Sequence, residues 1–437
     1  MHSKVTSNLN WGRNTKIFSK VFFPKNINEI KVFAKKHNLI FSGNNRSFGD
    51  NSINPKLIVS TKKLNKILNY DKKRGLINVE SGILLSEILK IIIADGWILP
   101  LMPGSKYVSV GGIIANNVHG KNSKKNQLKY YVNEIKVLLE SGKIITCSKS
   151  KNKKIFEMTI GGFGLTGAIL SAKIKLKKIK SSMISQQIIS FDNYKTFFEI
   201  IKKIKNNEYS VTWISSLEKN KISGLLYLGN HYNDKKFNKL TTYSGDKKLN
   251  LFNFFILKIF TQNYYLIKIL NNFYFFYKKF FFKKKVHWNP FFFPQDKFTN
   301  FNKIYGKDGF IQFQFCVSEN RLIETLNEIS LFFEKNKLHS SFVILKKFDE
   351  KGKYLNFHGK GMSVSMDIPI NKNYKNLKFF LNNLVIKRKI RINFSKDSLA
   401  THSYTKNING YKQFRKELHK INKKRKLNSL FSQRSKL

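Results

Sequence analysis

The chain has 437 residues, a formal net charge of +55 and only two cysteines. This length exceeds the size at which a single hydrophobic core usually stops growing, so we expect two domains. Two cysteines cannot build a disulfide framework, and the first residues lack the apolar core of a signal peptide. We therefore expect a reduced chain in the cytoplasm, with a peripheral position at the inner face of the membrane as a further possibility.

The positive charge comes almost entirely from lysine. Arginine contributes nine of the 81 basic residues. Such a chain is attracted to nucleic acid and to anionic membranes, but specific nucleic-acid readers usually favour arginine, and no familiar recognition module is visible. The heavy use of Lys, Asn, Ile and Phe indicates a coding bias as much as selection for a polyanion. Specific nucleic-acid binding is therefore not expected.

The first part of the chain reads as short strands interleaved with few helices. This pattern favours an α+β architecture over alternating βαβ units. Ser86 is the expected N-cap of the second helix and Gly96 its stop. In chain order we expect a helix over 27–38, a strand over 39–41, a strand over 76–82, a helix over 85–96, a hairpin over 133–147 and a glycine-rich turn leading into a strand within 160–179.

The pattern of expected elements changes after about residue 182, where the strands of a second sheet begin. We expect strands over 209–217, 224–231, 310–318 and 362–370, with a helix over 319–336. The segment 251–294 is densely aromatic, but lysines interrupt it too often for a transmembrane span. Two interpretations stay open for it: an interfacial segment that touches a membrane, or a helical hairpin with its aromatic side chains buried.

Three glycine-rich stretches give the first indication of chemistry: 43–51, 99–122 and 160–169. Glycine and asparagine tolerate left-handed backbone, and glycine lets a ligand approach the main chain closely. The backbone N–H groups of the first stretch could cradle a phosphate, with Arg46 offsetting its charge. None of the stretches matches the dinucleotide fingerprint or the P-loop, which argues against a Rossmann domain. Three such turns at strand ends suit one large ligand that carries a diphosphate.

The sequence also resembles a known family. The ordered motifs NWGRN, SGNNRSFGDN, INVESGILLSEIL, LMPGSKYVSVGGIIANNVHGKN and IGGFGLTGAI are similar to those of FAD-linked oxidoreductases with the vanillyl-alcohol-oxidase (PCMH-type) flavin domain. Within them the chain looks most like the branch of decaprenylphosphoryl-ribose oxidases. The resemblance covers nearly the whole chain except the aromatic insert. It implies a PCMH-type FAD domain over 1–181, a substrate domain with an antiparallel sheet over 182–390 and insert 251–294, and a C-terminal segment over 391–437 that returns to the FAD domain.

The resemblance implies a set of cofactor-binding residues and no metal. Relatives with covalent flavin carry a histidine in the first loop, where this chain has Asn45-Arg46-Ser47, so we expect non-covalent FAD. The residues implied are Gly43, Asn44, Asn45, Arg46, Ser47, Phe48, Gly49, Asp50, Asn51, Gly104, Ser109, Val110, Gly111, Gly112, Asn116, Asn117, Val118, His119, Ile169 and Asn393.

The resemblance points to Lys396 as the catalytic contact with the substrate hydroxyl. A lysine near a flavin and apolar walls has a lowered pKa and can act as a base. The same resemblance implies that Lys346 contacts a phosphate or sugar. Gln312 and Gln314 alternate along one strand, so both amides point to one face and suit sugar hydroxyls. Ser365 completes the expected substrate set, and Asp367 is expected to order this region.

Several positions depart from the family pattern. The aromatic hydroxyl of the first loop is replaced by Phe48, and a tyrosine three residues before the lysine is replaced by Asn393. Relatives often have asparagine and cysteine where this chain has Ser363 and Ser365. These departures leave the flavin domain intact and leave the identity of the sugar open.

The implied reaction is oxidation of a secondary hydroxyl on a polyprenyl-phosphate-linked pentose, or a similar sugar, to a keto-sugar. A short-chain reductase partner would complete a net epimerisation. Two alternatives stay open: a soluble aldonolactone or alditol oxidase, and a non-enzymatic basic protein that binds nucleic acid or membrane.

Overall fold

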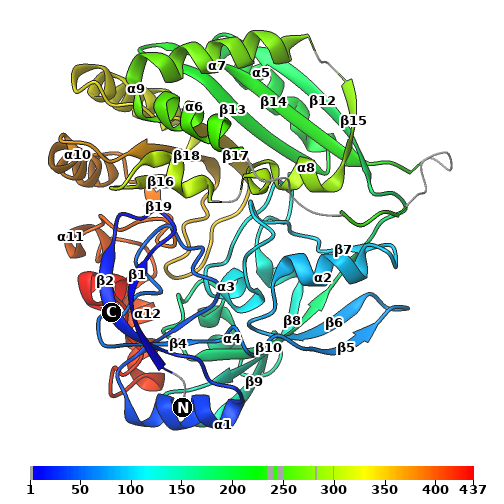
Figure 1. Ribbon diagram of the computed structural model, residues 1–437, viewed down its shortest axis with the longest axis vertical. Helices are drawn as coiled ribbons and strands as arrows, with labels where there is room; N and C mark the ends of the chain where they lie inside the picture. Colours follow the sequence, from blue (N-terminus) through cyan, green and yellow to red (C-terminus); the bar gives the residue numbers. More distant parts are fainter. Residues whose placement is uncertain (1–2, 234–239, 244–249, 281–282, 299) are drawn as a thin grey trace.

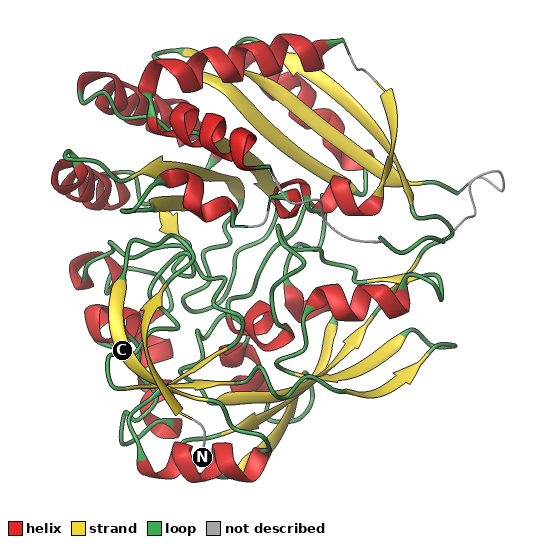
Figure 2. Ribbon diagram, in the orientation of Figure 1, coloured by secondary structure: helices red, strands yellow, loops and turns green. Residues whose placement is uncertain are grey.

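The computed structural model describes residues 3–233, 240–243, 250–280, 283–298 and 300–437. Two bodies of sheet and helix meet face to face, and loops fill the junction between them (Figures 1 and 2). Most strand pairs are antiparallel, and the helices lie over the sheets without alternating regularly with the strands. The α+β prediction is confirmed.

The N-terminal body holds two main sheets. One is four-stranded, in the order β1-β2-β4-β3, and the other is five-stranded, in the order β5-β6-β10-β8-β9; β11 and β7 form a small additional pair. Its elements are β1 (Ser3–Leu9), β2 (Lys16–Phe22), α1 (Ile27–Lys36), β3 (Ile40–Ser42), β4 (Leu57–Ser60), β5 (Ile67–Asp71), β6 (Leu76–Glu80), α2 (Leu85–Ile92), β7 (Trp97–Ile98), α3 (Val110–Ala115), β8 (Val132–Leu138), β9 (Ile144–Ser148), α4 (Lys153–Thr159), β10 (Ala168–Lys175) and β11 (Lys177–Lys178).

Local capping explains where the first helices begin. The Asn26 side chain accepts a hydrogen bond from the Glu29 N–H and so caps α1. The expectation that Ser86 caps α2 is wrong, because the helix begins at Leu85 and its N-cap is Leu84. The carboxylate of Glu87 accepts a hydrogen bond from the Leu84 N–H instead, at 2.8 Å. An acidic side chain in the first turn therefore replaces the expected hydroxyl cap.

The second body is built on one eight-stranded sheet with the order β15-β12-β14-β13-β17-β18-β16-β19. Helices α5, α9 and α10 bury their apolar faces in one large core with this sheet. The elements are β12 (Met183–Phe191), α5 (Tyr194–Lys202), β13 (Tyr209–Glu218), β14 (Lys221–His231), α6 (Leu251–Gln262), α7 (Tyr264–Lys279), β15 (Lys283–His287), α8 (Trp288–Phe292), β16 (Phe310–Val317), α9 (Glu319–Lys335), β17 (Phe342–Phe348), β18 (Gly361–Pro369), α10 (Tyr374–Lys387) and β19 (Arg391–Ile392).

The aromatic segment forms a helical hairpin of α6 and α7, which covers part of the second sheet. Phe275 packs with Ile188, Trp213 and Leu225 of the sheet, so one side of α7 is buried. Most other aromatic side chains of the hairpin are exposed. Of the two open interpretations, the hairpin is present, but its aromatic residues are not all buried. No helix in the described part of the chain is long and apolar enough to cross a membrane.

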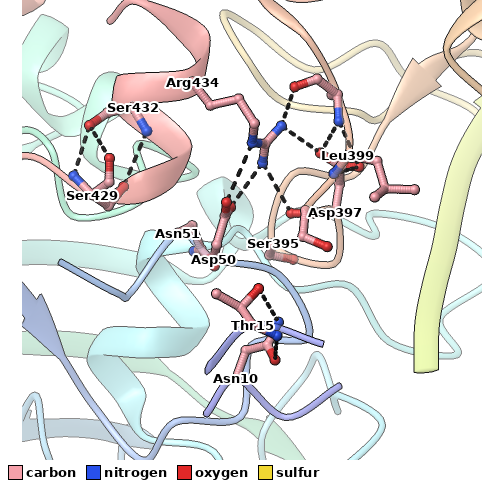
Figure 3. A network of polar contacts seen from close by, with 12 residues as sticks. Asn10, Thr15, Asp50, Asn51, Ser395, Asp397, Leu399, Ser429, Ser432 and Arg434 are labelled. Carbon is pink, nitrogen blue, oxygen red and sulfur yellow. Dashed lines mark hydrogen bonds and ion pairs between the residues drawn. The ribbon is translucent and has the colours of Figure 1, made fainter. Parts of the chain in front are cut away.

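The C-terminal segment returns to the N-terminal body through α11 (His402–Thr405), α12 (Tyr411–Ile421) and α13 (Leu430–Ser435). A single arginine fixes this return (Figure 3). The Arg434 guanidinium lies 2.9 Å from a carboxylate oxygen of Asp50 and 3.2 Å from one of Asp397. Burial raises the pKa of the Asp50 carboxyl, and Arg434 offsets part of that rise. One side chain thus joins the first glycine-rich loop to the loop that carries Lys396.

Replacing Arg434 with methionine should lower the free energy of unfolding by about 3–5 kcal/mol, because two buried carboxylates would lose their partner. Urea unfolding followed by tryptophan fluorescence measures this. The matched control is Arg74→Met, which removes an exposed partner of Asp71 and should cost less than about 1 kcal/mol. Equal losses in the two variants would contradict the role assigned to Arg434.

Candidate active site

A cavity of about 560 Å³ lies at the junction of the two bodies. Its wall includes residues from segments 41–52, 103–118, 163–169, 295–298 and 300–301, together with side chains near the second sheet such as Gln312 and Lys396. This volume falls within the range of pockets that bind cofactors and small ligands. The glycine-rich stretches, far apart in sequence, therefore border one space.

Most predicted cofactor residues line this cavity. They are Gly43, Asn44, Asn45, Arg46, Ser47, Phe48, Asn51, Gly104, Ser109, Gly111, Gly112, Asn116, Val118 and Ile169.

The remaining predicted cofactor residues do not line the cavity wall. Asp50 is turned to Arg434, and a Cβ built on Gly49 would meet the Asp397 carbonyl oxygen at 2.2 Å. Val110 is buried in the core of the N-terminal body. The side-chain oxygen of Asn117 accepts a hydrogen bond from the Leu128 N–H. These four residues hold the loops in place; His119 and Asn393 join a separate polar network.

The second glycine-rich stretch was expected to be a turn at a strand end. Its glycines Gly111 and Gly112 instead lie in the short helix α3. The Ser109 side chain accepts a hydrogen bond from the Gly112 N–H and caps this helix. A Cβ on Gly111 would lie 2.9 Å from the Cβ of Ser81, so glycine here lets the helix approach the end of β6. The adjacent glycines thus serve helix packing as well as access to the cavity.

The cavity wall fits a large polar cofactor such as FAD. The Ser81 hydroxyl and the Asn51 side-chain oxygen are buried without a hydrogen-bond partner in the protein, and both residues line the cavity. A bound ligand would satisfy these groups, which otherwise carry a desolvation cost. A Cβ on Gly104 would meet no atom within 4 Å, so there is open space beside this backbone.

Arg46 supplies positive charge to the same wall. Its guanidinium lies 3.8 Å from the centre of the Trp11 ring and 5.5 Å from that of Tyr107. Burial lowers the pKa of Arg46, while Asp296 raises it. Cation–π contacts with the two aromatic rings hold the guanidinium where it can offset the charge of a diphosphate.

Lys396 occupies the part of the cavity next to the second sheet. Its ammonium group hydrogen-bonds to the Gln312 side-chain oxygen and lies 4.8 Å from the centre of the Phe48 ring. Burial lowers the pKa of Lys396 to about 8, although Asp367 acts to raise it. A lysine with this pKa exchanges a proton close to neutral pH, as a general base requires.

Asp367 orders this group, as expected. One carboxylate oxygen accepts a hydrogen bond from the Gln312 side-chain N–H at 2.6 Å, and the other accepts one from the Tyr305 hydroxyl at 3.2 Å. Burial raises the pKa of Asp367 to about 6. The amide of Gln312 is thereby oriented with its oxygen toward Lys396. No sequence motif marks Tyr305, so this contact was not predicted.

The other predicted substrate residues form a second network behind the cavity wall. The Gln314 amide nitrogen lies 2.9 Å from Nε2 of His119, and the Asn393 amide donates a hydrogen bond to the Gln314 oxygen at 2.7 Å. The Lys346 ammonium donates to the Gly120 carbonyl at 3.0 Å and lies 3.4 Å from Nδ1 of His119. Ser365 faces Gln314 in the neighbouring strand. None of these residues is part of the described cavity wall.

Lys121 is a further basic group that the sequence analysis missed. Its ammonium group hydrogen-bonds to the Phe291 carbonyl, and burial lowers its pKa to about 7. The proximity of Lys121 also contributes to the lowered pKa of Lys346, after burial. The signal was present in the sequence, because Lys121 directly follows His119-Gly120 in the motif already singled out.

Comparisons with known proteins agree with this geometry. Residues 19–148 match the model of the FAD binding domain. This match and the relatives described next indicate an FAD-dependent oxidoreductase that acts on CH–OH groups.

Individual relatives match over different lengths. The chain is 25% identical over 377 residues to decaprenylphosphoryl-β-D-ribose oxidase of Mycolicibacterium smegmatis, which covers 83% of this chain and 81% of that protein. It is 33% identical over 148 residues to a D-lactate dehydrogenase of Anaerostipes hadrus, and 25% identical over 172 residues to L-gulonolactone oxidase of Bos taurus. These two matches cover 31% and 39% of the respective relatives.

The described residues that line the cavity include neither histidine nor cysteine. We therefore predict that FAD is released when the protein is denatured. The purified protein should show a flavin absorption band that moves to the supernatant after acid precipitation. Yellow colour that remains in the washed pellet would contradict non-covalent binding.

Proposed function

We propose that the protein oxidises a secondary hydroxyl of a pentose, or of a similar sugar, that is linked through phosphate to a polyprenyl chain. The observation that carries the proposal is the Lys396–Gln312–Asp367 chain of hydrogen bonds, which holds a base of lowered pKa at the cavity. The similarity to decaprenylphosphoryl-β-D-ribose oxidase over most of both chains supports the choice of substrate.

In the proposed reaction the bound FAD supplies the acceptor for the hydride of the carbinol carbon. Lys396, in its neutral form, accepts the proton of the substrate hydroxyl at Nζ. Gln312 keeps this nitrogen in place, because its own amide is held by Asp367. Phe48 and the loop beside it exclude water from one side of the ammonium group.

The lysines behind the wall favour a phosphorylated sugar over a neutral lactone. Lys121 and Lys346 are half-buried neighbours. Among the described residues, no ion pair joins either of them to a carboxylate. Burial lowers the pKa of both ammonium groups, and a substrate phosphate that reached them would favour their charged forms. A reductase of the short-chain class would then convert the keto-sugar to the epimer.

The test is anaerobic mixing of the flavin-loaded protein with a synthetic prenylphosphoryl pentose or with L-gulonolactone, followed by the flavin absorbance. Bleaching by the prenylphosphoryl pentose, and much weaker bleaching by the lactone, is the expected result. Rapid bleaching by the lactone alone would establish the aldonolactone alternative, which the similarity to L-gulonolactone oxidase makes the second candidate.

Replacing Lys396 with methionine keeps the length of the side chain and removes the base. The rate of flavin bleaching should fall by about a hundred- to ten-thousand-fold, while the flavin content stays unchanged. Lys375→Met, which removes an exposed lysine of α10, is the matched control and should bleach at the wild-type rate. Wild-type rates in the Lys396 variant would remove this residue from the mechanism.

The pH dependence follows from the protonation of Lys396. Its pKa is about 8, and only the neutral amine above this pKa accepts a proton. In the wild type, kcat/KM should therefore rise with pH by about tenfold per unit below pH ~8 and level off above it. The residual activity of Lys396→Met should lack this rise. The same slope in both proteins would assign the titration to another group.

A further inference from the structure

The outward side of the α6–α7 hairpin is apolar, which is the reverse of an ordinary surface helix. On α7 the exposed apolar residues recur at intervals of three or four, which places them on one face of the helix. Phe273 is 70% exposed and Phe280 76%. The residues of α7 and its C-cap with this spacing are Tyr265, Ile269, Phe273, Phe276 and Phe280, and Tyr274 and Tyr277 lie exposed beside them. On α6 the exposed apolar residues are Phe252, Phe255, Ile256 and Ile259.

The exposed apolar face of α7 is not the side of the helix that packs on the protein core. The opposite side of α7 already packs on the sheet through Phe275, and Ile267 is also buried. Figure 1 places α7 along the outer edge of the second body, away from the N-terminal body. Exposed apolar groups gathered in this way on one element indicate an interaction surface.

The charge around the exposed apolar face of the hairpin indicates what kind of partner it binds. Residues 251–285 contain seven lysines and neither aspartate nor glutamate. Three of the lysines, Lys283, Lys284 and Lys285, lie exposed on β15, the edge strand that follows α7. A segment that combines exposed aromatic side chains with lysines and no acidic residue is complementary to an anionic bilayer, where aromatic rings enter the headgroup region and lysines meet lipid phosphates.

The hairpin also borders the cavity. Its helix α6 packs on the 3-10 turn Phe301–Tyr305, where the Thr261 hydroxyl donates a hydrogen bond to the Ile304 carbonyl at 3.1 Å. Phe254 and Leu257 of α6 share a cluster with Phe301 and Phe48, both of which line the cavity. The segment that forms the apolar face is therefore in direct contact with the cavity wall.

We infer that the α6–α7 hairpin and β15 dock the protein on an anionic lipid membrane, with the exposed aromatic face in the headgroup region. The binding is peripheral, because it uses the faces of two helices that lie along the bilayer surface. This inference does not depend on which sugar is oxidised, although it brings the cavity close to a lipid-linked substrate.

The test is flotation of the flavin-loaded protein with two kinds of vesicle: pure phosphatidylcholine, and phosphatidylcholine containing about one third phosphatidylglycerol. The protein should float with the anionic vesicles, and high salt should weaken this binding. Phe273→Ser/Phe276→Ser should reduce the bound fraction by about tenfold or more, because the aromatic anchors are lost. The flavin spectrum and content should remain those of the wild type, since both side chains point outward.

The matched control is Phe18→Ser/Phe379→Ser, which removes two phenylalanines that are 75% and 72% exposed on other elements. This control should float like the wild type. Failure of the wild type to bind either vesicle, or equal loss in both double variants, would overturn the inference. A change from dimer to monomer in the Phe273/Phe276 variant without any vesicle binding by the wild type would assign the face to a second copy of the chain. None of these outcomes depends on substrate oxidation, so they are separate from the test of the proposed function.

Discussion

The ion pairs of Arg434 with Asp50 and Asp397 are the interaction on which the site depends. They join three segments that are remote in sequence: the first glycine-rich loop, the loop that carries Lys396, and the last helix (Figure 3). The close approach of Gly49 to the Asp397 backbone adds to this junction. Asp50, expected to contact the cofactor, instead positions the loop whose other residues line the cavity.

From this junction the polar groups continue into the second sheet. Lys396 contacts Gln312, Gln312 contacts Asp367, and Asp367 contacts Tyr305. Each group fixes the next, so the base is positioned by a chain of satisfied hydrogen bonds. Burial shifts the pKa values of the two ionisable groups beside Gln312 in opposite directions. It raises the pKa of the Asp367 carboxyl and lowers that of the Lys396 ammonium group.

The departures from the family pattern have local consequences. Phe48 offers Lys396 a ring face in place of a hydroxyl, so the contact is electrostatic and apolar without a hydrogen bond. Asn393, in the place of a tyrosine, is short enough to be buried and donates its hydrogen bond to Gln314. Phe48 lines the cavity beside Lys396, whereas Asn393 lies behind the cavity wall, so the two changes act on different parts of the site.

The sequence by itself determined the α+β class, most strands and helices, and the glycine-rich motifs that form the cavity, because hydrophobic periodicity and backbone freedom are local properties. The tertiary structure decided which motif residues face the cavity. Asp50 and Asn117 lie in the motifs whose other residues line the cavity, yet Asp50 pairs with Arg434 and Asn117 accepts a hydrogen bond from the Leu128 N–H. It also decided that Lys121 lies beside Lys346 and that the aromatic face of α7 points outward. These outcomes depend on long-range packing and on the balance between desolvation and pairing, which no local pattern encodes.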